Sequence, residues 1–438
     1  MSHWFDTLAV WLEANPHWLA LTILVMACIE CLAVAGLIIP GTVMLFSLGV
    51  LAGSGALELW QTVLLAYVGG LLGDLASYGL GRRYHQHIRE LPPLRKHPAW
   101  LSGAERYFQR YGVASLLVGR FIGPLRPMLP LVAGMLDMPF VRFLLVSLLA
   151  AAGWAVAYML PGWATGAALR LPLPDGFWSE AGAVAGAIAL MLVLVIHSSL
   201  REQRWATALA AGLSGLLLVA LLLGANHLQA LDQGLLTLVQ EQRAPAMDSA
   251  ALLITGLGDF DTQLAAGVLL TLLLLFAKRI QAALYLGSCM LLTAIANGGL
   301  KQLFARARPD VLLQPLDTFS LPSGHSSAAF ACFLALGVLA GRGASARTRL
   351  TWLLLASLPA LAIALSRVYL GVHWPTDILA GALLAGMICA LSLAWLQRRA
   401  PIPPLGARVW WLVLPATLAL LGSISVWALP EALEQYRY

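Results

Sequence analysis

The sequence predicts an all-α polytopic membrane protein, and three observations carry that prediction. Of its 438 residues, 60% are hydrophobic and only 11% are charged, whereas soluble domains carry about 25% charged residues. Apolar runs of about 20 residues, the length of a membrane-spanning helix, recur along the chain. In the first half, some of these runs are cut by proline, glycine and charged residues, which favours re-entrant hairpins there.

The second half predicts seven simple spans, each bounded by short polar segments. We therefore expect a six-helix bundle with one extra span, which is the last of the series. The seven lie near 205–224, 251–277, 280–300, 326–341, 350–366, 376–396 and 408–429.

The first half predicts a less regular arrangement. A run from Leu19 to about Leu57 is broken by "IIPGT" at 38–42, and the run 113–136 is cut by two arginines and three prolines. Each break predicts a re-entrant hairpin, which membranes tolerate where protein or a watery cavity covers the free backbone groups. Ordinary spans are expected at 60–80, 140–168 and 177–199, and an interfacial or cytoplasmic excursion at 82–110.

Basic residues predict the orientation of the second half. Because successive spans cross the membrane in opposite directions, the loops alternate between the two sides. Nine Lys and Arg residues then lie on one side and five on the other. Since such residues concentrate in cytoplasmic loops, we expect the first side to be cytoplasmic and the second extracytoplasmic. The nine are Arg201, Arg204, Lys278, Arg279, Arg342, Arg347, Arg349, Arg398 and Arg399; the five are Arg243, Lys301, Arg306, Arg308 and Arg367.

Composition also excludes several classes of function. The net charge of +6 fits the loop topology, and without a basic stripe interleaved with aromatic residues we expect no nucleic-acid partner. The five cysteines all lie inside apolar runs, where Cys behaves as a small hydrophobe. We therefore expect no disulfide framework, no metal site and no cofactor.

Three polar clusters on the extracytoplasmic side predict an anion site. They are "KQLFARARP" at 301–309, "LPSGH" at 321–325 and "SRVYLGVHWPTD" at 366–377. Arginine forks match phosphate oxygens, and "SG" before a helix start adds a hydroxyl and backbone N–H donors. The three cations that we expect to share this pocket are Lys301, Arg308 and Arg367.

Two histidines supply the chemistry of such a site. His373 and Asp377 are four residues apart, so they share a face if a helix has begun by then, and the carboxylate would orient the imidazole as a nucleophile. His325 could protonate a leaving alkoxide. Cations would stabilise charge on the transferring phosphoryl group, which predicts a metal-independent reaction.

These motifs resemble those of the PAP2 family, the type 2 phosphatidic acid phosphatases. Lys-x6-Arg-Pro, Pro-Ser-Gly-His and Ser-Arg-x5-His-x3-Asp occur in this order, and the resemblance covers roughly residues 201–438. It implies that His373 forms a phosphohistidine, that Asp377 supports it, and that His325 is the general acid. The residues that the resemblance implies in phosphate binding are Lys301, Arg308, Ser323, Gly324 and Arg367.

Four ionisable residues in the membrane runs of the first half form a second candidate site. Glu30, Asp74, Arg120 and Arg126 each lie by a glycine or proline break or within a broken run. Acid and base inside a membrane often mark an ion or substrate path, and two hairpins meeting at mid-membrane are a transporter layout. The alternative is that Glu–Arg and Asp–Arg pairs only hold the fold.

This half resembles the DedA family over about residues 10–170. The resemblance rests on Glu30 with Pro40-Gly41, on Gly73-Asp74…Tyr78…Gly81, and on Arg120-Phe121…Pro124…Arg126. In "GRFIGPLRP" the proline comes one residue later than in the common "RFIPG" form. The resemblance implies transport of phospholipids or polyprenyl phosphates, with Glu30 and Asp74 carrying protons and Arg120 and Arg126 holding the headgroup.

Together these features predict a lipid phosphatase fused to a lipid translocator in the bacterial inner membrane. We expect a DedA-like domain at 1–175, a connecting helix and basic linker at 176–204, and a PAP2-like domain at 205–438. The best substrate is undecaprenyl pyrophosphate, because its monophosphate product must return inward. Phosphatidate or phosphatidylglycerophosphate hydrolysis with a scaffold-only first half, and phosphate transfer to another lipid, remain alternatives. The expected partners are the lipid bilayer and a lipid phosphate substrate. Both a monomer and a homo-oligomer are compatible with the sequence.

Overall fold

The computed structural model confirms the all-α membrane fold. It describes residues 11–12, 14–38, 40–90, 95, 98–112, 114–120, 125–314, 316, 318–399 and 401–437. Over these residues there is no strand, and helices make up 82% of the structure. Among the same residues, eight helices are long and apolar enough to cross a membrane. The chain divides into two compact units, residues 1–172 and 173–438.

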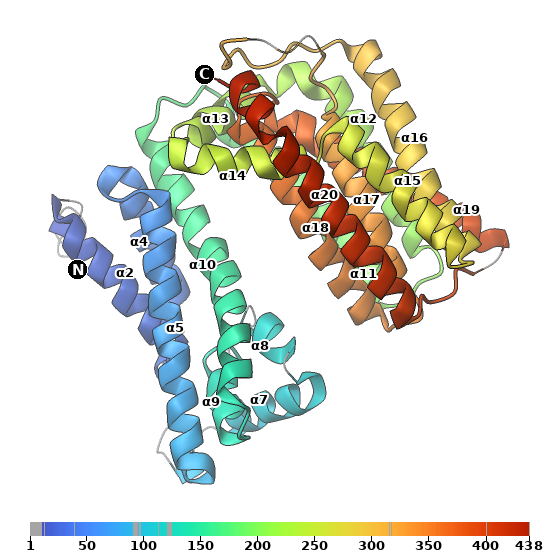
Figure 1. Cartoon of the computed structure of the whole chain (residues 1–438). Coiled ribbons are helices and arrows are strands. Elements are labelled where there is room, and N and C mark those ends of the chain that lie inside the picture. Colours follow the sequence, from blue (N-terminus) through green and yellow to red (C-terminus); the bar gives the residue numbers. More distant parts are fainter. Residues whose placement is uncertain are drawn as a thin grey trace. The chain divides into compact units, whose positions relative to one another are not determined.

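The first unit is organised around one long helix, α5, which contacts α2, α9 and α10 (Figure 1). The helices of this unit are α2 (Pro16–Cys31), α3 (Ala35–Ile38), α4 (Gly41–Leu51), the π-helical turn η1 (Ala52–Ala56), α5 (Leu59–Tyr84), the 3₁₀ turn η2 (His85–Glu90), α7 (Pro98–Tyr111), α8 (Ala114–Gly119), α9 (Met128–Met135) and α10 (Phe140–Arg170).

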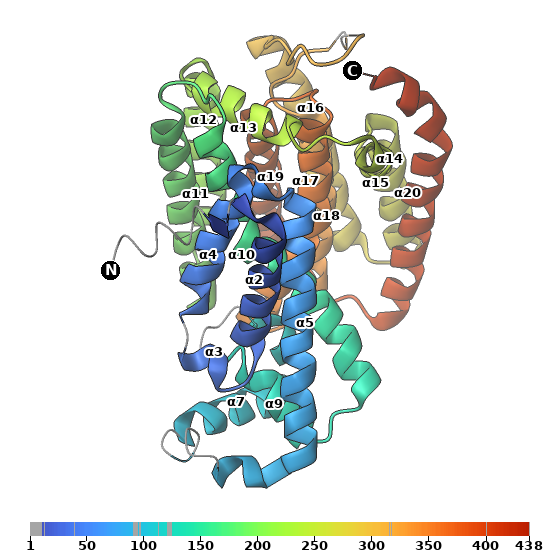
Figure 2. The same cartoon turned by 90° about the vertical axis from the view of Figure 1, so that its left-hand side faces the viewer.

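Two helical breaks face each other beside α5, and Figure 2 shows α3 near α9 there. The first break joins α2 to α4 through α3, and the second joins α8 to α9. A Cβ added at Gly36 in α3 would lie 3.3 Å from the Cβ of Pro127, just before α9. The two turns therefore touch, as expected for hairpins that meet. Residues 121–124, which include Phe121 and Pro124 of the predicted motif, lie outside the described residues.

The first break begins earlier than the sequence predicted. Helix α2 ends at Cys31, well before the predicted "IIPGT" at 38–42, and Val34 takes a positive φ of 71°. Polar backbone groups freed at such a break must find other partners. Ser77 of α5 supplies them, because its Oγ accepts from Ala33 N at 2.8 Å and donates to Cys31 O at 3.2 Å.

The second unit is a helical bundle in which α17 contacts α15, α16, α18 and α19. Its helices are α11 (Phe177–Leu200), α12 (Ala206–Gly224), the 3₁₀ turn η3 (Ala225–His227), α13 (Gln229–Gln240), α14 (Pro245–Gly256), α15 (Phe260–Phe276), α16 (Ile280–Phe304), α17 (Gly324–Ala340), α18 (Ala346–Tyr369), α19 (Pro375–Arg399) and α20 (Ala407–Gln435). Helix α11, for which the sequence suggested a connecting role, packs on α12 and α13 of this unit.

One predicted span is wrong as a single helix. The run 251–277 is split into α14 and α15, which bend by 47° relative to each other. Gly256, Gly258 and Asp259 form the break, and glycine disfavours a continuous helix because it leaves the backbone more freedom. The break places Asp259 beside the start of α17, which matters for the site described below.

The loops of the bundle gather in two sets at its ends. At one end Arg349 reaches Glu202 at 3.4 Å, and Arg342 Nε donates to Ile402 O at 3.3 Å. At the other end Leu313 N donates to Arg437 O at 3.0 Å. The loops that hold Arg342 and Arg349 thus contact different partners from the loop that follows the first sequence motif.

We predict that Gly81→Ala destabilises the first unit whereas Gly79→Ala does not. Both glycines lie near the end of α5, but a Cβ at Gly81 would collide with the backbone carbonyl of Leu131 in α9. Nothing lies within 4 Å of a Cβ at Gly79. Overpacking costs about 1–3 kcal/mol, while an exposed Gly→Ala change in a helix is favourable by about 1 kcal/mol.

The measurement is thermal unfolding of the purified protein in detergent. The expected result is a lower Tm for Gly81→Ala and an unchanged or higher Tm for Gly79→Ala. Equal Tm values for the two variants would contradict the close α5–α9 contact.

Candidate functional site

The three sequence motifs of the second unit lie against one another. Ser323 caps α17, because its Oγ accepts from Ser326 N at 3.4 Å, and Ser323 N donates to Asp377 O at 3.0 Å. Helix α19 approaches closely here, since a Cβ at Gly381 would lie 2.8 Å from Ser323 O. The "PSGH" turn is therefore fixed to the start of α19, directly beside the third motif.

His373 and Asp377 form the centre of this site. His373 Nδ1 lies 3.3 Å from Asp377 Oδ2, and both side chains are almost fully buried. The contact does not come from two turns of one helix, as the spacing suggested, because α19 begins only at Pro375. The loop before α19 places the imidazole over the first turn instead. Trp374 N also donates to Asp377 Oδ2, at 2.9 Å.

The His373 imidazole is neutral at pH 7, and its second nitrogen is Nε2. Burial lowers the pKa of His373 well below 6.5, and Arg308, Arg367 and Lys301 add to this effect. With Nδ1 facing the Asp377 carboxylate, the proton belongs on Nδ1, and Nε2 keeps its lone pair. Nε2 lies 3.0 Å from Arg308 Nη1, so the nitrogen that keeps its lone pair faces a cation.

The predicted cations converge on the same place. Lys301 Nζ donates to Phe319 O at 2.9 Å, and Arg308 Nε donates to Thr318 O at 2.7 Å. Burial and Arg367 lower the pKa of Arg308 to about 10, so it stays charged at pH 7. The acceptors now used are carbonyl oxygens of the loop before "PSGH". Phosphate oxygens would compete for the same donors.

The third cation, Arg367, is buried inside the bundle with 1% of its surface exposed. Its Nη1 donates to Thr255 Oγ1 at 2.9 Å and to Tyr436 Oη at 2.8 Å. The guanidinium carbon also lies 5.3 Å from the Tyr436 ring centroid, and Nε has no hydrogen-bond partner. Tyr436 follows the extra helix α20, so that helix contributes to the site.

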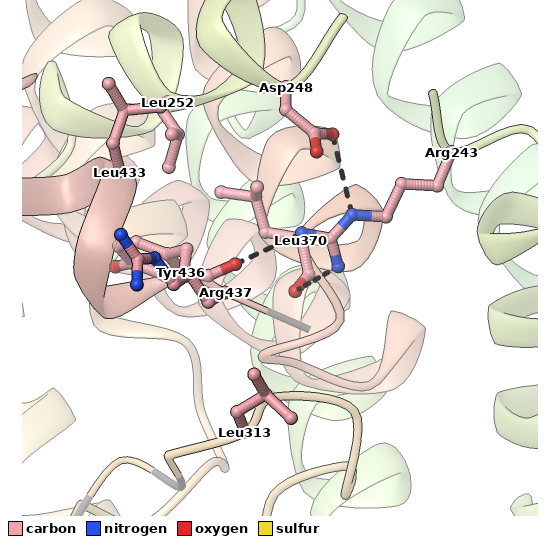
Figure 3. Close-up of a pocket in the computed structure, with 8 residues that line it drawn as sticks. All are labelled: Arg243, Asp248, Leu252, Leu313, Leu370, Leu433, Tyr436 and Arg437. Atoms are coloured by element: carbon pink, nitrogen blue, oxygen red, sulfur yellow. Dashed lines mark hydrogen bonds and ion pairs between the residues drawn. The ribbon is translucent and has the colours of Figure 1, made fainter. Parts of the chain in front are cut away.

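A pocket of about 220 Å³ opens beside Tyr436 (Figure 3). Its walls are mainly apolar, with Arg243 bridging Asp248 at 3.5 Å. Neither His325 nor His373 lines this pocket, and Tyr436 connects it to Arg367. The leucines that line it are Leu252, Leu313, Leu370 and Leu433.

Sequence reasoning missed the residues that hold Asp377. Arg306 Nη1 donates to Asp377 Oδ1 at 2.9 Å, and its Nη2 donates to Asp232 Oδ2 at 2.6 Å. Asp232 Oδ1 in turn accepts from Thr376 N at 2.9 Å. Arg306 stands within a predicted motif, but Asp232 is a single acid on α13 whose partners lie far along the chain, so no spacing pointed to it.

His325 also has a partner that the sequence did not reveal. It lies in the first turn of α17, and its Nε2 is 2.6 Å from Asp259 Oδ1 at the α14–α15 break. The predicted Gly324 packs nearby, where a Cβ would lie 4.0 Å from Lys301 Cε. The eight residues expected in the phosphatase site lie in one region, since the charges of Arg308 and Arg367 lower the pKa of both His325 and His373.

The first unit brings its four predicted charges together as two buried ion pairs. Arg126 Nη2 bonds Glu30 Oε1, and Arg120 Nη1 bonds Asp74 Oδ2. Each of the four side chains is at most 5% exposed. Glu30 ends α2, and Arg126 lies just before α9, so the first pair joins the two facing breaks.

These pairs leave donors and acceptors unused. Within the part of the chain that the structure describes, four buried atoms have no hydrogen-bond partner: Arg126 Nη1 and Nε, Arg120 Nε and Glu30 Oε2. The two guanidiniums lie over Trp154, at 5.1 Å for Arg120 and 5.7 Å for Arg126. Buried donors without a partner are costly. The cluster therefore has spare capacity for an anion or a proton.

Comparison with known proteins finds a matching family model in each half of the chain. The family model described as the PAP2 superfamily matches residues 282–401, and the model described as the VTT domain matches residues 39–164. Two solved structures resemble the chain. A Bacillus subtilis PAP2-type phosphatidylglycerolphosphate phosphatase has 24% identity and a TM-score of 0.40, covering 43% of this chain and 96% of that one. Aquifex aeolicus LpxE has 28% identity and a TM-score of 0.30, covering 37% and 93%.

Curated relatives match about a third of the chain. Inner membrane protein YabI of Escherichia coli is 40% identical over 152 residues, covering 35% of this chain and 60% of YabI. Undecaprenyl phosphate transporter A of Bacillus subtilis is 25% identical over 167 residues, covering 36% and 79%. The chain spans about 60% of the length of the first relatives that it matches. It is a multi-pass membrane protein that joins a VTT domain of the DedA type to a domain of the PAP2 superfamily.

Proposed function

We propose that the second half is a lipid phosphatase that works through a phosphohistidine on His373. The observation that carries the proposal is the orientation of this buried imidazole. Nδ1 faces Asp377 at 3.3 Å while Nε2 faces Arg308 at 3.0 Å. A neutral histidine held in this way presents a lone pair to a cation-bound phosphate. The PAP2 superfamily match over residues 282–401 supports the same reaction.

The reaction begins when phosphate oxygens take over the donors of Lys301, Arg308 and Arg367. These donors would stabilise the charge that develops on the transferring phosphoryl group. His373 Nε2 attacks phosphorus. The proton on Nδ1 stays on the ring and keeps its hydrogen bond to Asp377, whose negative charge balances the positive charge of the ring. His325 protonates the leaving oxygen and later deprotonates the water that hydrolyses the intermediate. No step calls on a metal ion.

We infer that the site faces the extracytoplasmic side and that undecaprenyl pyrophosphate is its substrate. The excess of basic residues in the opposite loops supports the orientation. The first half is related to an undecaprenyl phosphate transporter. This relationship supports the substrate, because hydrolysis of undecaprenyl pyrophosphate yields undecaprenyl phosphate, which would be the transporter's cargo. Phosphatidate and phosphatidylglycerophosphate are the competing substrates.

The first half, in our proposal, translocates a lipid phosphate. The partnerless donors of Arg120 and Arg126 would hold its headgroup, and Glu30 and Asp74 would exchange protons with it. Intramembrane ionisable residues of this kind mark substrate and ion paths.

We predict that His373→Ala abolishes release of inorganic phosphate, by at least about a thousandfold, as loss of a nucleophile does. Phosphate release from undecaprenyl pyrophosphate, phosphatidate and phosphatidylglycerophosphate would be measured with EDTA present throughout. His197→Ala is the control, because His197 is exposed on α11 and should leave the rate unchanged. Release that survives His373→Ala would rule out this nucleophile, and the preferred lipid among the three identifies the substrate class.

A second prediction follows from the lowered pKa of His373. The folded protein keeps this imidazole neutral, whereas the unfolded chain binds a proton below about pH 6.5, so acid destabilises the fold. Between pH 7.5 and 5.5 the parent should lose about 1 kcal/mol more stability than His373→Gln, which lacks this ionisation. The measurement is unfolding of both proteins at the two pH values. Parallel losses would contradict a neutral buried histidine.

A third prediction separates transport from scaffolding in the first half. Removing Arg126 alone would leave the buried Glu30 charge without its partner and lower the free energy of unfolding by about 3–5 kcal/mol. The double variant Glu30→Gln with Arg126→Gln removes both charges. The double variant should keep a Tm and a phosphate release close to the parent's. It should no longer translocate a fluorescent prenyl phosphate across vesicle bilayers. Translocation is measured by dithionite quenching of the fluorescence. Normal translocation by a folded double variant would mean that the pair only holds the fold.

A further inference from the structure

Asp259 occupies a helix start but does not act as a helix cap. Its backbone is extended, with φ −60° and ψ 149°, as is usual for the residue before α15. Aspartate at this position normally accepts from a backbone N–H of the first turn, yet its side chain makes no such bond. Instead Oδ1 lies 2.6 Å from His325 Nε2. An aspartate at a helix start that does not cap its helix departs from the local sequence preference, and such departures are expected at functional sites.

The chain around Asp259 is shaped to allow this contact. Gly258 packs against His325, where an added Cβ would lie 3.3 Å from both the Cβ and Cδ2 of the histidine. The same Cβ would collide with the side chain of Ile363 on α18. The 47° bend between α14 and α15 and the glycine at this position therefore bring the carboxylate to the start of α17.

Stability does not explain the arrangement. The Asp259 side chain is 40% exposed and that of His325 is 18% exposed, and ion pairs with this much solvent access contribute little to stability. A cap on α15 would stabilise the fold at least as well. The contact is better explained by what it does to the imidazole.

We propose that Asp259 is the positioning residue of the general acid His325, an inference that rests on the phosphatase function proposed above. By accepting a hydrogen bond from Nε2–H, the carboxylate fixes which nitrogen exchanges protons with the substrate. Among the described residues, no hydrogen-bond partner of Nδ1 is recorded. The geometry therefore assigns proton transfer to His325 Nδ1. A carboxylate that orients a histidine in this way also balances the charge of its doubly protonated form.

The proton balance of both half-reactions follows from this assignment. The first begins with His325 protonated on both nitrogens, a form that Asp259 and the negative charge of the bound phosphate favour. The P–N bond to His373 forms and the bond from phosphorus to the lipid oxygen breaks, while the Nδ1 proton of His325 moves to that oxygen. His325 is then neutral, with its remaining proton on Nε2 facing Asp259. In the second, Nδ1 accepts a proton from water as the water oxygen bonds to phosphorus. The P–N bond breaks, inorganic phosphate leaves, and His373 regains its lone pair.

The test uses two phosphate esters that carry the same long alkyl chain and differ in their leaving group. One is an alkyl phosphate, whose alkoxide needs protonation to leave, and the other is a nitrophenyl phosphate, whose phenolate does not. The parameter is kcat/KM, because it includes only steps up to departure of the leaving group. Asp259→Asn removes the charge with almost no change in shape. Asp261→Asn, on the exposed first turn of α15, is the matched control.

We expect Asp259→Asn to lower kcat/KM for the alkyl phosphate by about 100-fold and for the nitrophenyl phosphate by less than about threefold, since general acid catalysis contributes about 10²- to 10⁴-fold. Asp261→Asn should change neither value. Equal losses on both esters would assign Asp259 a structural role, and no loss on either would show that His325 does not need it. Either result overturns the inference. Failure of the proposed function is distinct, because the parent itself would then cleave neither ester.

Discussion

A charge buried inside a helical bundle must be balanced within that bundle, and this constraint shapes both halves of the chain. Leaving such a charge without a partner costs several kcal/mol. In the second half Asp377 meets the constraint by facing Arg306 and the Trp374 amide as well as His373. These contacts keep the carboxylate in place under the imidazole. The reactive nitrogen is thereby turned towards Arg308.

The same constraint is met differently in the first half. There Glu30 and Asp74 each bond one arginine, but several donors on those arginines stay without a partner. In the second half Lys301 and Arg308 use carbonyl oxygens of a loop, which a phosphate could replace, while Arg367 uses the hydroxyls of Thr255 and Tyr436. The two halves thus differ in how their buried cations are held. In the first half carboxylates bind them, and in the second half neutral oxygens do.

Sequence reasoning predicts a site where spacing encodes it. The eight residues of the predicted phosphatase site stand in three short motifs at loop–helix junctions, and the alternation of spans predicts that such junctions share one end of the bundle. Asp259 and Asp232 could not be found in this way, because their partners lie 66 and 144 residues away. The early end of α2 was missed for a similar reason. Its freed backbone groups depend on Ser77, which lies 44 residues beyond Ala33, while Pro40-Gly41 is the stronger local signal.

The central claim is that a phosphoryl group passes through His373, and the most direct measurement is to trap and map it. Purified protein would be mixed with a lipid phosphate, quenched in alkali, where phosphohistidine survives, and digested for mass spectrometry. The account predicts phosphate on the peptide that contains His373. With a nitrophenyl phosphate ester, whose leaving group needs no proton, it predicts more of it in His325→Ala, which cannot activate water. Phosphate on any other side chain, or none in a protein that turns over rapidly, would contradict the account.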